Sequence, residues 1–328
     1  MTKTNKILIA VLVLQVVLIM GMRFGGESNL DYTATRVLPT LEADDVTSLQ
    51  IDGPPKTGDG PPQNSVTLTK KNGAWGVASA DDFPVEATKV KELLEKLESL
   101  TSRTRVLDSG TYHEKLEVAP DKFQRKVTLD AKGTKTVLYV GSSASFKNVH
   151  VRVDGQDAVY LVNDFATTDV GDRAWNWVDR DYVKLDKANV WRVDVKNAKG
   201  TLTLEKNPVD NLWAALGVTE PLDKTKVDDL VRKATQIDME APVSKAAKPE
   251  FGLDSPLATV TMVTGTSTIA GTPPPKTDFV TVKVGKKIEA ESAYYVKAST
   301  SEYVVKVQAF GVEPLVNHTK DDLLKKEE

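Results

Sequence analysis

The sequence has 328 residues, of which 40% are hydrophobic and 27% are charged, so it is long enough to form two globular domains. Its formal net charge of −3 argues against binding to nucleic acid and against electrostatic docking on an anionic lipid surface. The chain contains no cysteine, which excludes a disulfide framework, a thiolate nucleophile, a cysteine-ligated metal and the anchor of a bacterial lipoprotein.

Residues 1–23 have the pattern of a targeting segment. Lys3 and Lys6 precede an apolar run over 7–22, and Arg23 closes it. As a helix this run spans about 24 Å, and snorkelling of its basic flanks offsets the deficit against a roughly 30 Å hydrocarbon core. A cleaved signal peptide is the alternative, but residues 20–23 lack its small-x-small site. We expect an uncleaved signal anchor in the bacterial inner membrane, single-pass, with the bulk of the chain periplasmic.

We interpret residues 24–44 as a tether and residues 45–187 as a first folded unit. Val46–Asp52 and Ser65–Lys71 are predicted strands, and Asn72-Gly73 predicts a hairpin turn before a returning strand that contains Trp75. After a helix, a meander of four short β-rich runs follows, over 126–129, 136–140, 149–153 and 158–162.

The helix between these strands is predicted over 84–101. Its apolar side chains fall on one stripe at 3.6-residue spacing, namely Val90, Leu93, Leu94, Leu97 and Leu100. A second helix over 221–239 has the same stripe, shifted by a constant 137 positions, and Asp223 is its predicted N-cap. A period of this length indicates a duplicated domain.

The other elements recur in the same order over residues 188–324. Trp213 matches Trp75, Val284-Gly285 matches Val140-Gly141, and the segment FGLDSP at 251–256 places Leu253 opposite Leu116. The sequence therefore predicts an α+β protein of two tandem repeats. Each repeat is expected to be an antiparallel sheet with one amphipathic helix packed on it.

This pattern resembles a bacterial family known as domain of unknown function 4340. The similarity lies in the Trp-then-Pro entry to each helix, FGLDSP at 251–256, the Val-Gly strand end and the tyrosine-valine hairpin over 294–305. The resemblance implies tandem repeats behind an N-terminal anchor. It also implies a periplasmic accessory role, because such genes often lie beside those of gliding-type ABC transporters. The family provides no catalytic residues.

No constellation of side chains in the sequence predicts catalysis, a cofactor or a metal. The three histidines, His113, His150 and His318, have no ligand spacing, and we interpret them as solvated. Adjacent carboxylates such as Asp81-Asp82 and Asp228-Asp229 diverge along the chain, whereas hydrolytic pairs face each other across a cleft. We therefore predict that the protein is not an enzyme.

The segment 169–182, between the repeats, concentrates aromatic and basic side chains. Its candidate interaction residues are Arg173, Trp175, Trp177, Arg180 and Tyr182. Trp, Tyr and Arg are typical of interaction hot spots, and exposed aromatic rings also stack on sugars. The alternative is that these rings join the two repeats.

Two functions are compatible with these observations. The first is a non-enzymatic, membrane-anchored periplasmic accessory or scaffold protein whose partners are subunits of a membrane complex such as a gliding-type ABC transporter. The second is a module that binds cell-wall or surface polysaccharide. The sequence predicts contact with the inner membrane through residues 7–22 in both cases, and no nucleic-acid partner.

Overall fold

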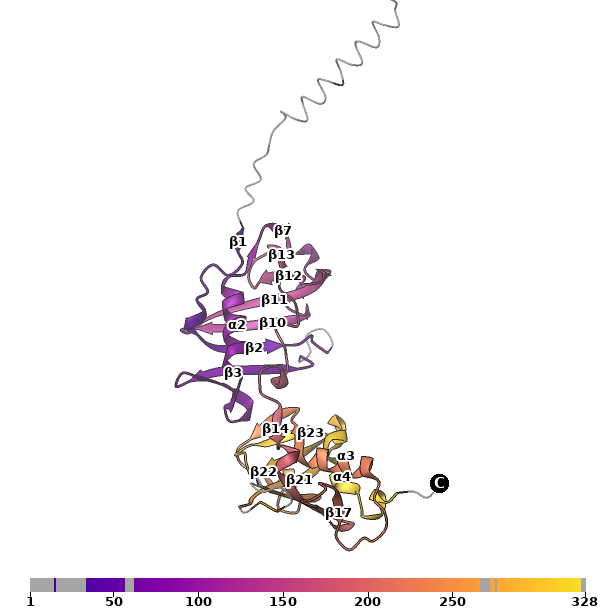
Figure 1. Cartoon of the computed structure of the whole chain (residues 1–328). Helices are drawn as coiled ribbons and strands as arrows, with labels where there is room; N and C mark the ends of the chain where they lie inside the picture. Colours follow the sequence, from indigo (N-terminus) through magenta and orange to yellow (C-terminus); the bar gives the residue numbers. More distant parts are fainter. Residues whose placement is uncertain (1–14, 16–33, 57–61, 266–271, 275, 326–328) are drawn as a thin grey trace, which may run out of the picture.

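The computed structural model describes residue 15 and residues 34–56, 62–265, 272–274 and 276–325. Within these ranges no helix combines the length and the apolar character needed to cross a membrane. Apart from residue 15, the predicted anchor over 7–22 lies outside the described residues. The described chain forms two β-rich repeats that lie end to end (Figure 1).

The first repeat is built on a nine-stranded antiparallel sheet that α2 (Ala87–Glu98) crosses (Figure 1). In order across the sheet the strands are β5 (Phe83–Pro84), β4 (Ala74–Val77), β3 (Ser65–Lys71), β2 (Val46–Asp52), β10 (Arg125–Ala131), β11 (Thr134–Ser145), β12 (Asn148–Val153), β13 (Val159–Asn163) and β7 (Thr104–Leu107). A separate small hairpin pairs β8 (Val118–Ala119) with β9 (Lys122–Phe123).

The second repeat has the same order with eight antiparallel strands. They are β17 (Trp213–Ala215), β16 (Gly200–Lys206), β15 (Val190–Asn197), β20 (Ala258–Thr264), β21 (Asp278–Ile288), β22 (Ala293–Ala298), β23 (Val304–Gln308) and β19 (Ala241–Ser244). Two helices, α3 (Lys224–Thr235) and α4 (Ala309–Asn317), pack against each other beside this sheet. The α+β class and the tandem arrangement are therefore confirmed, but the prediction of one helix per repeat is wrong for the second repeat, which adds α4.

Both predicted helices are present and bury the predicted stripe. In α2 the residues Val90, Leu93, Leu94 and Leu97 are buried. The helix begins later than predicted because Pro84 belongs to β5. Leu100, the last residue of the predicted stripe, lies beyond the C-terminal end of the helix but is also buried. Asp223 caps α3 as predicted, since its carboxylate accepts hydrogen bonds from the backbone N–H groups of Thr225 and Lys226.

Each repeat begins earlier than the sequence indicated. Within the predicted tether 24–44, β1 (Thr35–Arg36) pairs with β6 (Thr101–Ser102), and Val37, Leu38 and Leu41 are buried in the core. The equivalent pair in the second repeat is β14 (Asp181–Lys184) with β18 (Gln236–Asp238). Residues 34–44 are thus part of the first repeat, and 181–187 part of the second. These segments are too short to give a periodic signal.

The recurring Val-Gly dipeptide marks a point where another part of the backbone crosses the sheet. A Cβ at Gly141 would overlap the carbonyl oxygen of Leu116, and a Cβ at Gly285 would overlap that of Phe251. Strand pairing shifts register across each glycine, between Val140 and Ser143 in β11 and between Val284 and Lys287 in β21. The motif is therefore a bulge that admits a crossing loop, for which glycine is required.

The structure shifts the alignment of the two repeats by two residues in the loops that cross these glycines. Val118 lies against Gly141 as Leu253 lies against Gly285, so Leu253 is the counterpart of Val118 and not of Leu116. The preceding residue has a left-handed backbone in both loops, with φ of 57° at Glu117 and 67° at Gly252. The sequence comparison missed this equivalence because a glutamate occupies the position where the second repeat has glycine.

Eight 3-10 turns connect these elements in the described part of the chain. They are Ala43–Asp45, Ala78–Ala80, Gly110–Tyr112, Ala174–Asn176, Lys187–Asn189, Pro249–Phe251, Glu289–Glu291 and Asp321–Leu323. The C-terminal part of the described chain is tied to the second repeat, because Leu324 forms an isolated antiparallel bridge with Leu222.

Candidate functional site

The segment that joins the repeats first packs on the helix of the first repeat. Phe165 is fully buried, and the Lys96 ammonium of α2 lies 2.9 Å from an Asp169 carboxylate oxygen. The other oxygen of Asp169 accepts a hydrogen bond from the backbone N–H of Ala166 at 2.7 Å. The beginning of the segment is therefore fixed to α2 by one buried ring and one ion pair.

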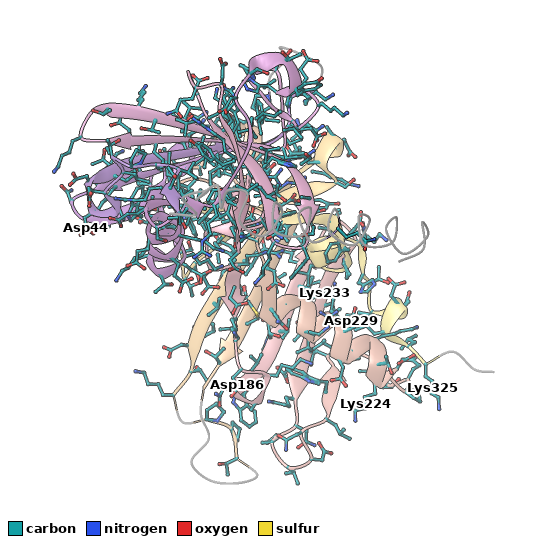
Figure 2. All side chains as sticks on the ribbon, turned by 90° about the horizontal axis from the view of Figure 1, so that it is seen from above. Asp44, Asp186, Lys224, Asp229, Lys233 and Lys325 are labelled. Carbon is teal, nitrogen blue, oxygen red and sulfur yellow. The ribbon has the colours of Figure 1, made fainter. Side chains whose placement is uncertain are left out.

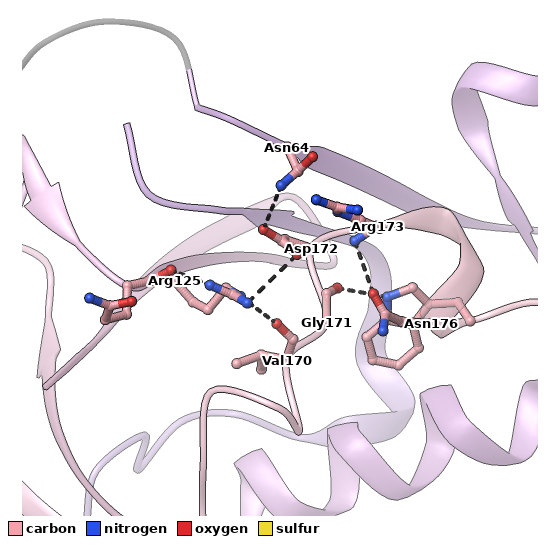
Figure 3. Close-up of polar contacts among 9 residues, drawn as sticks. Asn64, Arg125, Val170, Gly171, Asp172, Arg173 and Asn176 are labelled. Carbon is pink, nitrogen blue, oxygen red and sulfur yellow. Dashed lines mark hydrogen bonds and ion pairs between the residues drawn. The ribbon is translucent and has the colours of Figure 1, made fainter. Parts of the chain in front are cut away.

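Asp172 is the polar centre of this segment (Figure 3). Its side chain is only 10% exposed, accepts a hydrogen bond from Asn64 at 3.3 Å and lies 3.6 Å from the guanidinium of Arg125. The same guanidinium donates to the carbonyl oxygen of Val170 at 3.1 Å. A Cβ at residue 53 would overlap the Asp172 carboxylate, which explains the glycine there. Through these contacts Asp172 holds the joining segment against the first sheet.

Trp177 and Tyr182, two of the five predicted interaction residues, are buried. The Trp177 indole donates to the carbonyl oxygen of Gly171 at 2.9 Å, and its own carbonyl accepts from the N–H of Glu86 at 2.7 Å. The Tyr182 hydroxyl donates to the carbonyl oxygen of Tyr303 at 2.6 Å. Trp177 therefore belongs to the core of the first repeat and Tyr182 to that of the second.

Arg173, Trp175 and Arg180 remain at the surface. The guanidinium carbons of Arg173 and Arg180 lie 4.7 Å and 5.6 Å from the centre of the half-buried Trp175 ring. Arg180 also donates to the carbonyl oxygen of Met239 at 3.1 Å. Neither guanidinium has a carboxylate partner among the described residues. The predicted interaction surface thus consists of these three residues.

The repeats touch directly through a second contact that sequence reasoning missed. The Asp81 carboxylate accepts from the backbone N–H of Lys245 at 2.9 Å, and its carbonyl oxygen accepts from the Tyr303 hydroxyl at 3.3 Å. The rings of Phe83 and Tyr303 meet edge to face at 4.7 Å. Asp81 has a left-handed backbone, with φ of 51°. In the sequence this contact is marked only by the adjacent carboxylates Asp81-Asp82, and the structure places Asp81 at the contact between the repeats.

A polar cavity of about 600 Å³ lies between the repeats beside Trp175. The first repeat and the joining segment contribute Asn64, Asp172 and Arg173, whereas the second contributes Glu291 and Lys306. The Lys306 ammonium is paired with the Glu291 carboxylate at 2.6 Å. This ion pair neutralises Lys306, whereas Arg173 and Lys56, the other cations in the lining, have no carboxylate partner among the described residues.

Two of the three histidines that the sequence analysis considered form hydrogen bonds within the first repeat. The Nε2–H of His113 donates to the carbonyl oxygen of Asp157 at 2.9 Å, and His150 Nδ1 lies 3.1 Å from the Ser142 hydroxyl. His150 is half-buried and bonded, so it is not the solvated strand histidine that the sequence predicted. Within the described residues no group of three acidic or histidine side chains could hold a metal ion.

Comparison with protein-family models matches two adjacent segments of the chain, residues 75–220 and 213–327, to one family. The two segments begin at Trp75 and Trp213, which occupy the same place in the β3–β4 and β16–β17 hairpins. No curated protein and no solved structure matches the chain. Because the matched segments cover most of the sequence, the chain belongs to the family described as Domain of unknown function (DUF4340).

Proposed function

We propose that this protein is a non-enzymatic accessory or scaffold protein, anchored in the bacterial inner membrane by residues 7–22 with its two repeats in the periplasm. The apolar run flanked by Lys6 and Arg23 supports the anchor and its orientation. Membership of this family supports subunits of a gliding-type ABC transporter complex as partners, because genes of the family often lie beside the genes of such transporters.

The observation that carries the proposal is the surface formed by Arg173, Trp175 and Arg180. A half-buried tryptophan flanked by two guanidinium groups that have no carboxylate partner among the described residues has the composition of an interaction hot spot. Asp172 and Trp177 hold this segment rigidly from beneath, so the three side chains are presented with little conformational freedom. A preorganised surface of this kind suits a protein partner with carboxylates that meet the arginines.

The test is mild crosslinking in intact membranes, followed by purification of the full-length protein in detergent and mass spectrometry. We expect the wild-type chain to capture an ABC permease or its auxiliary subunits, and Trp175→Ala to lose this capture. Trp191→Ala is the matched control, because Trp191 is also half-buried beneath a cation but lies in β15. Recovery of the protein alone, or equal capture by both variants, contradicts the proposal.

Polysaccharide binding is the second candidate, and the polar cavity beside Trp175 favours it. A sugar ring would have to displace at least one of the two guanidinium groups that already lie over the indole. For this reason the accessory role fits the geometry better. Full-length protein that sediments with peptidoglycan, and fails to do so as Trp175→Ala, would favour the carbohydrate function instead.

A further inference from the structure

The two sheets differ at one edge. In the first repeat β5 covers the outer side of β4, pairing Pro84 with Gly76 and Phe83 with Val77. In the second repeat β17 is the terminal strand, and no strand of the described residues pairs with its outer side. The carbonyl oxygen of Ala215 in β17 accepts from the N–H of Val218 at 3.1 Å. The other outward backbone N–H and C=O groups of an uncovered edge can pair with another chain.

An apolar groove of about 480 Å³ lies between this open edge and α3. We call it the Trp213 groove, and its apolar lining consists of Leu212, Trp213, Ala214, Ala215, Val218, Leu222 and Val227. Three large apolar side chains are exposed within eight residues of sequence, namely Val209 (76%), Leu212 (54%) and Leu216 (58%). Leu212 also lines the groove, and Leu216 directly follows the lining residue Ala215, so exposed apolar side chains continue from the groove along the chain.

The equivalent groove of the first repeat serves as an internal control. It lies between Trp75 and α2, has a volume of about 320 Å³, and is walled mostly by charged side chains. These are Glu42, Asp44, Lys70, Lys91, Glu95 and Glu98. One of the pairs, Lys91 with Glu95, is an ion pair at 3.6 Å. The apolar groove is thus a property of the second repeat and not of the fold.

The rim of the Trp213 groove carries charges of both signs. Glu220 and Asp228 are acidic, and Lys224, which projects from α3 in Figure 2, is basic. Hydrogen bonds from its own backbone N–H and that of Thr219 lower the pKa of the Glu220 carboxyl, so it is ionised at neutral pH. No ion pair joins these three side chains to one another or to another described residue. Two copies of a rim with charges of one sign would repel each other. In two copies of this rim, the basic residue of one copy can pair with an acidic residue of the other.

We propose that the open edge of β17 and the Trp213 groove form a two-fold interface between two copies of this chain. In such an interface the same patch serves both partners, so Leu216 of each copy enters the groove of the other. The Lys224 ammonium of one copy then meets an acidic rim residue of its partner. The surface is separate from Arg173, Trp175 and Arg180, so this inference does not depend on the proposed function.

The absence of cysteine from the sequence allows a direct test of strand pairing. Ala214 is the central residue of β17 and is exposed. In an antiparallel β17 pair whose two-fold axis passes through the centre of the strand, Ala214 lies opposite its own copy. Paired strands bring opposite Cα atoms to roughly 4.5–5.5 Å, within the range that a disulfide requires. We expect full-length Ala214→Cys to form a disulfide-linked dimer in membranes under mild oxidation. Ala74→Cys, exposed on the equivalent hairpin of the first repeat, should stay monomeric.

Light scattering of the full-length protein in detergent tests the groove itself. We expect a dimeric mass for the wild type and a monomeric mass for Leu216→Asp, which places a charge in the apolar contact. A monomeric wild type overturns the proposal, and so does a dimer that survives Leu216→Asp. A dimer that crosslinks equally well through Ala74→Cys places the interface elsewhere and overturns it too. Capture of membrane subunits is scored separately, so failure of the dimer and failure of the accessory role are distinguishable.

Discussion

Gly285 shows how one residue can be fixed by a backbone crossing. A Cβ at this position would overlap the carbonyl oxygen of Phe251, and backbone cannot move aside as a flexible side chain can. We predict that Gly285→Ala lowers the free energy of unfolding by about 1–3 kcal/mol, the usual cost of overpacking. Urea unfolding measures it. Gly110→Ala is the control, because the nearest atom to its Cβ would be 3.6 Å away. Equal unfolding midpoints for both variants would contradict the crossing geometry.

Tyr182 couples stability to alkaline pH. Its hydroxyl donates to the carbonyl oxygen of Tyr303 and accepts from the N–H of Ala298 at 2.9 Å, and burial raises its pKa above 10. At neutral pH, Tyr182→Phe should cost roughly 1–3 kcal/mol because a buried N–H loses its partner.

The pH dependence of that cost has a defined sign. The pKa of Tyr182 in the folded state lies above the unfolded value of about 10. The stabilisation that protonated Tyr182 gives the folded state is therefore fully present below pH 10, and it is lost as the pH rises through the folded pKa. The stability difference between wild type and Tyr182→Phe should therefore shrink above pH 10, measured by denaturant unfolding at several pH values. Tyr112→Phe, at a 50% exposed tyrosine, should show neither effect. A difference that stays constant to pH 11 would show that Tyr182 ionises equally in both states.

At the scale of elements, the joining segment separates two tryptophans that sequence reasoning treated alike. Trp177 is 3% exposed and donates a buried hydrogen bond, whereas Trp175 is half-buried beneath two arginines. We predict that Trp177→Ala costs about 3–5 kcal/mol of unfolding free energy. Trp175→Ala should cost only about 1 kcal/mol, the order of an exposed cation–π contact. Thermal unfolding compares the two, and similar losses would mean that both rings serve as core.

Elements with a long periodic pattern were predictable from the sequence. The stripes of α2 and α3, the Asn72-Gly73 hairpin and the paired meanders all follow from spacing and turn residues. The two-residue strands β1 and β6 were not, because pairing across 65 residues leaves no local signal. α4 was also missed, since it contains Gly311 and Pro314, which normally interrupt helices.

At the scale of the whole molecule, the two repeats are coupled by a small joint. Phe83 of the first repeat meets Tyr303 of the second in an edge-to-face contact. We predict a coupling energy of about 0.5–1.5 kcal/mol in a double-mutant cycle of Phe83→Leu and Tyr303→Leu. Calorimetric unfolding of the four proteins measures it. The cycle of Phe83→Leu with Tyr295→Leu is the control and should be additive, because Tyr295 stacks on Phe251 within its own repeat.

The candidate site was predictable in composition but not in arrangement. Clustering of Trp and Arg between the repeats singled out the joining segment, and three of its five residues do lie at the surface. Which rings are buried depends on Gly171 and Glu86, whose backbone groups bind Trp177, and on Tyr303, whose carbonyl accepts from Tyr182. These partners are up to 121 positions away in sequence, so spacing alone cannot identify them.

The chain passes only once from the first repeat into the second, and this affects the order in which the two repeats can fold. Every strand of the first nine-stranded sheet comes from residues 46–163, and the segment that closes its core ends near Trp177. No strand is exchanged between the two large sheets in the described part of the chain. Because the polypeptide reaches the compartment in which it folds N-terminal part first, the first repeat can complete its folding before the similar strands of the second arrive, and so before they can compete for the same pairings.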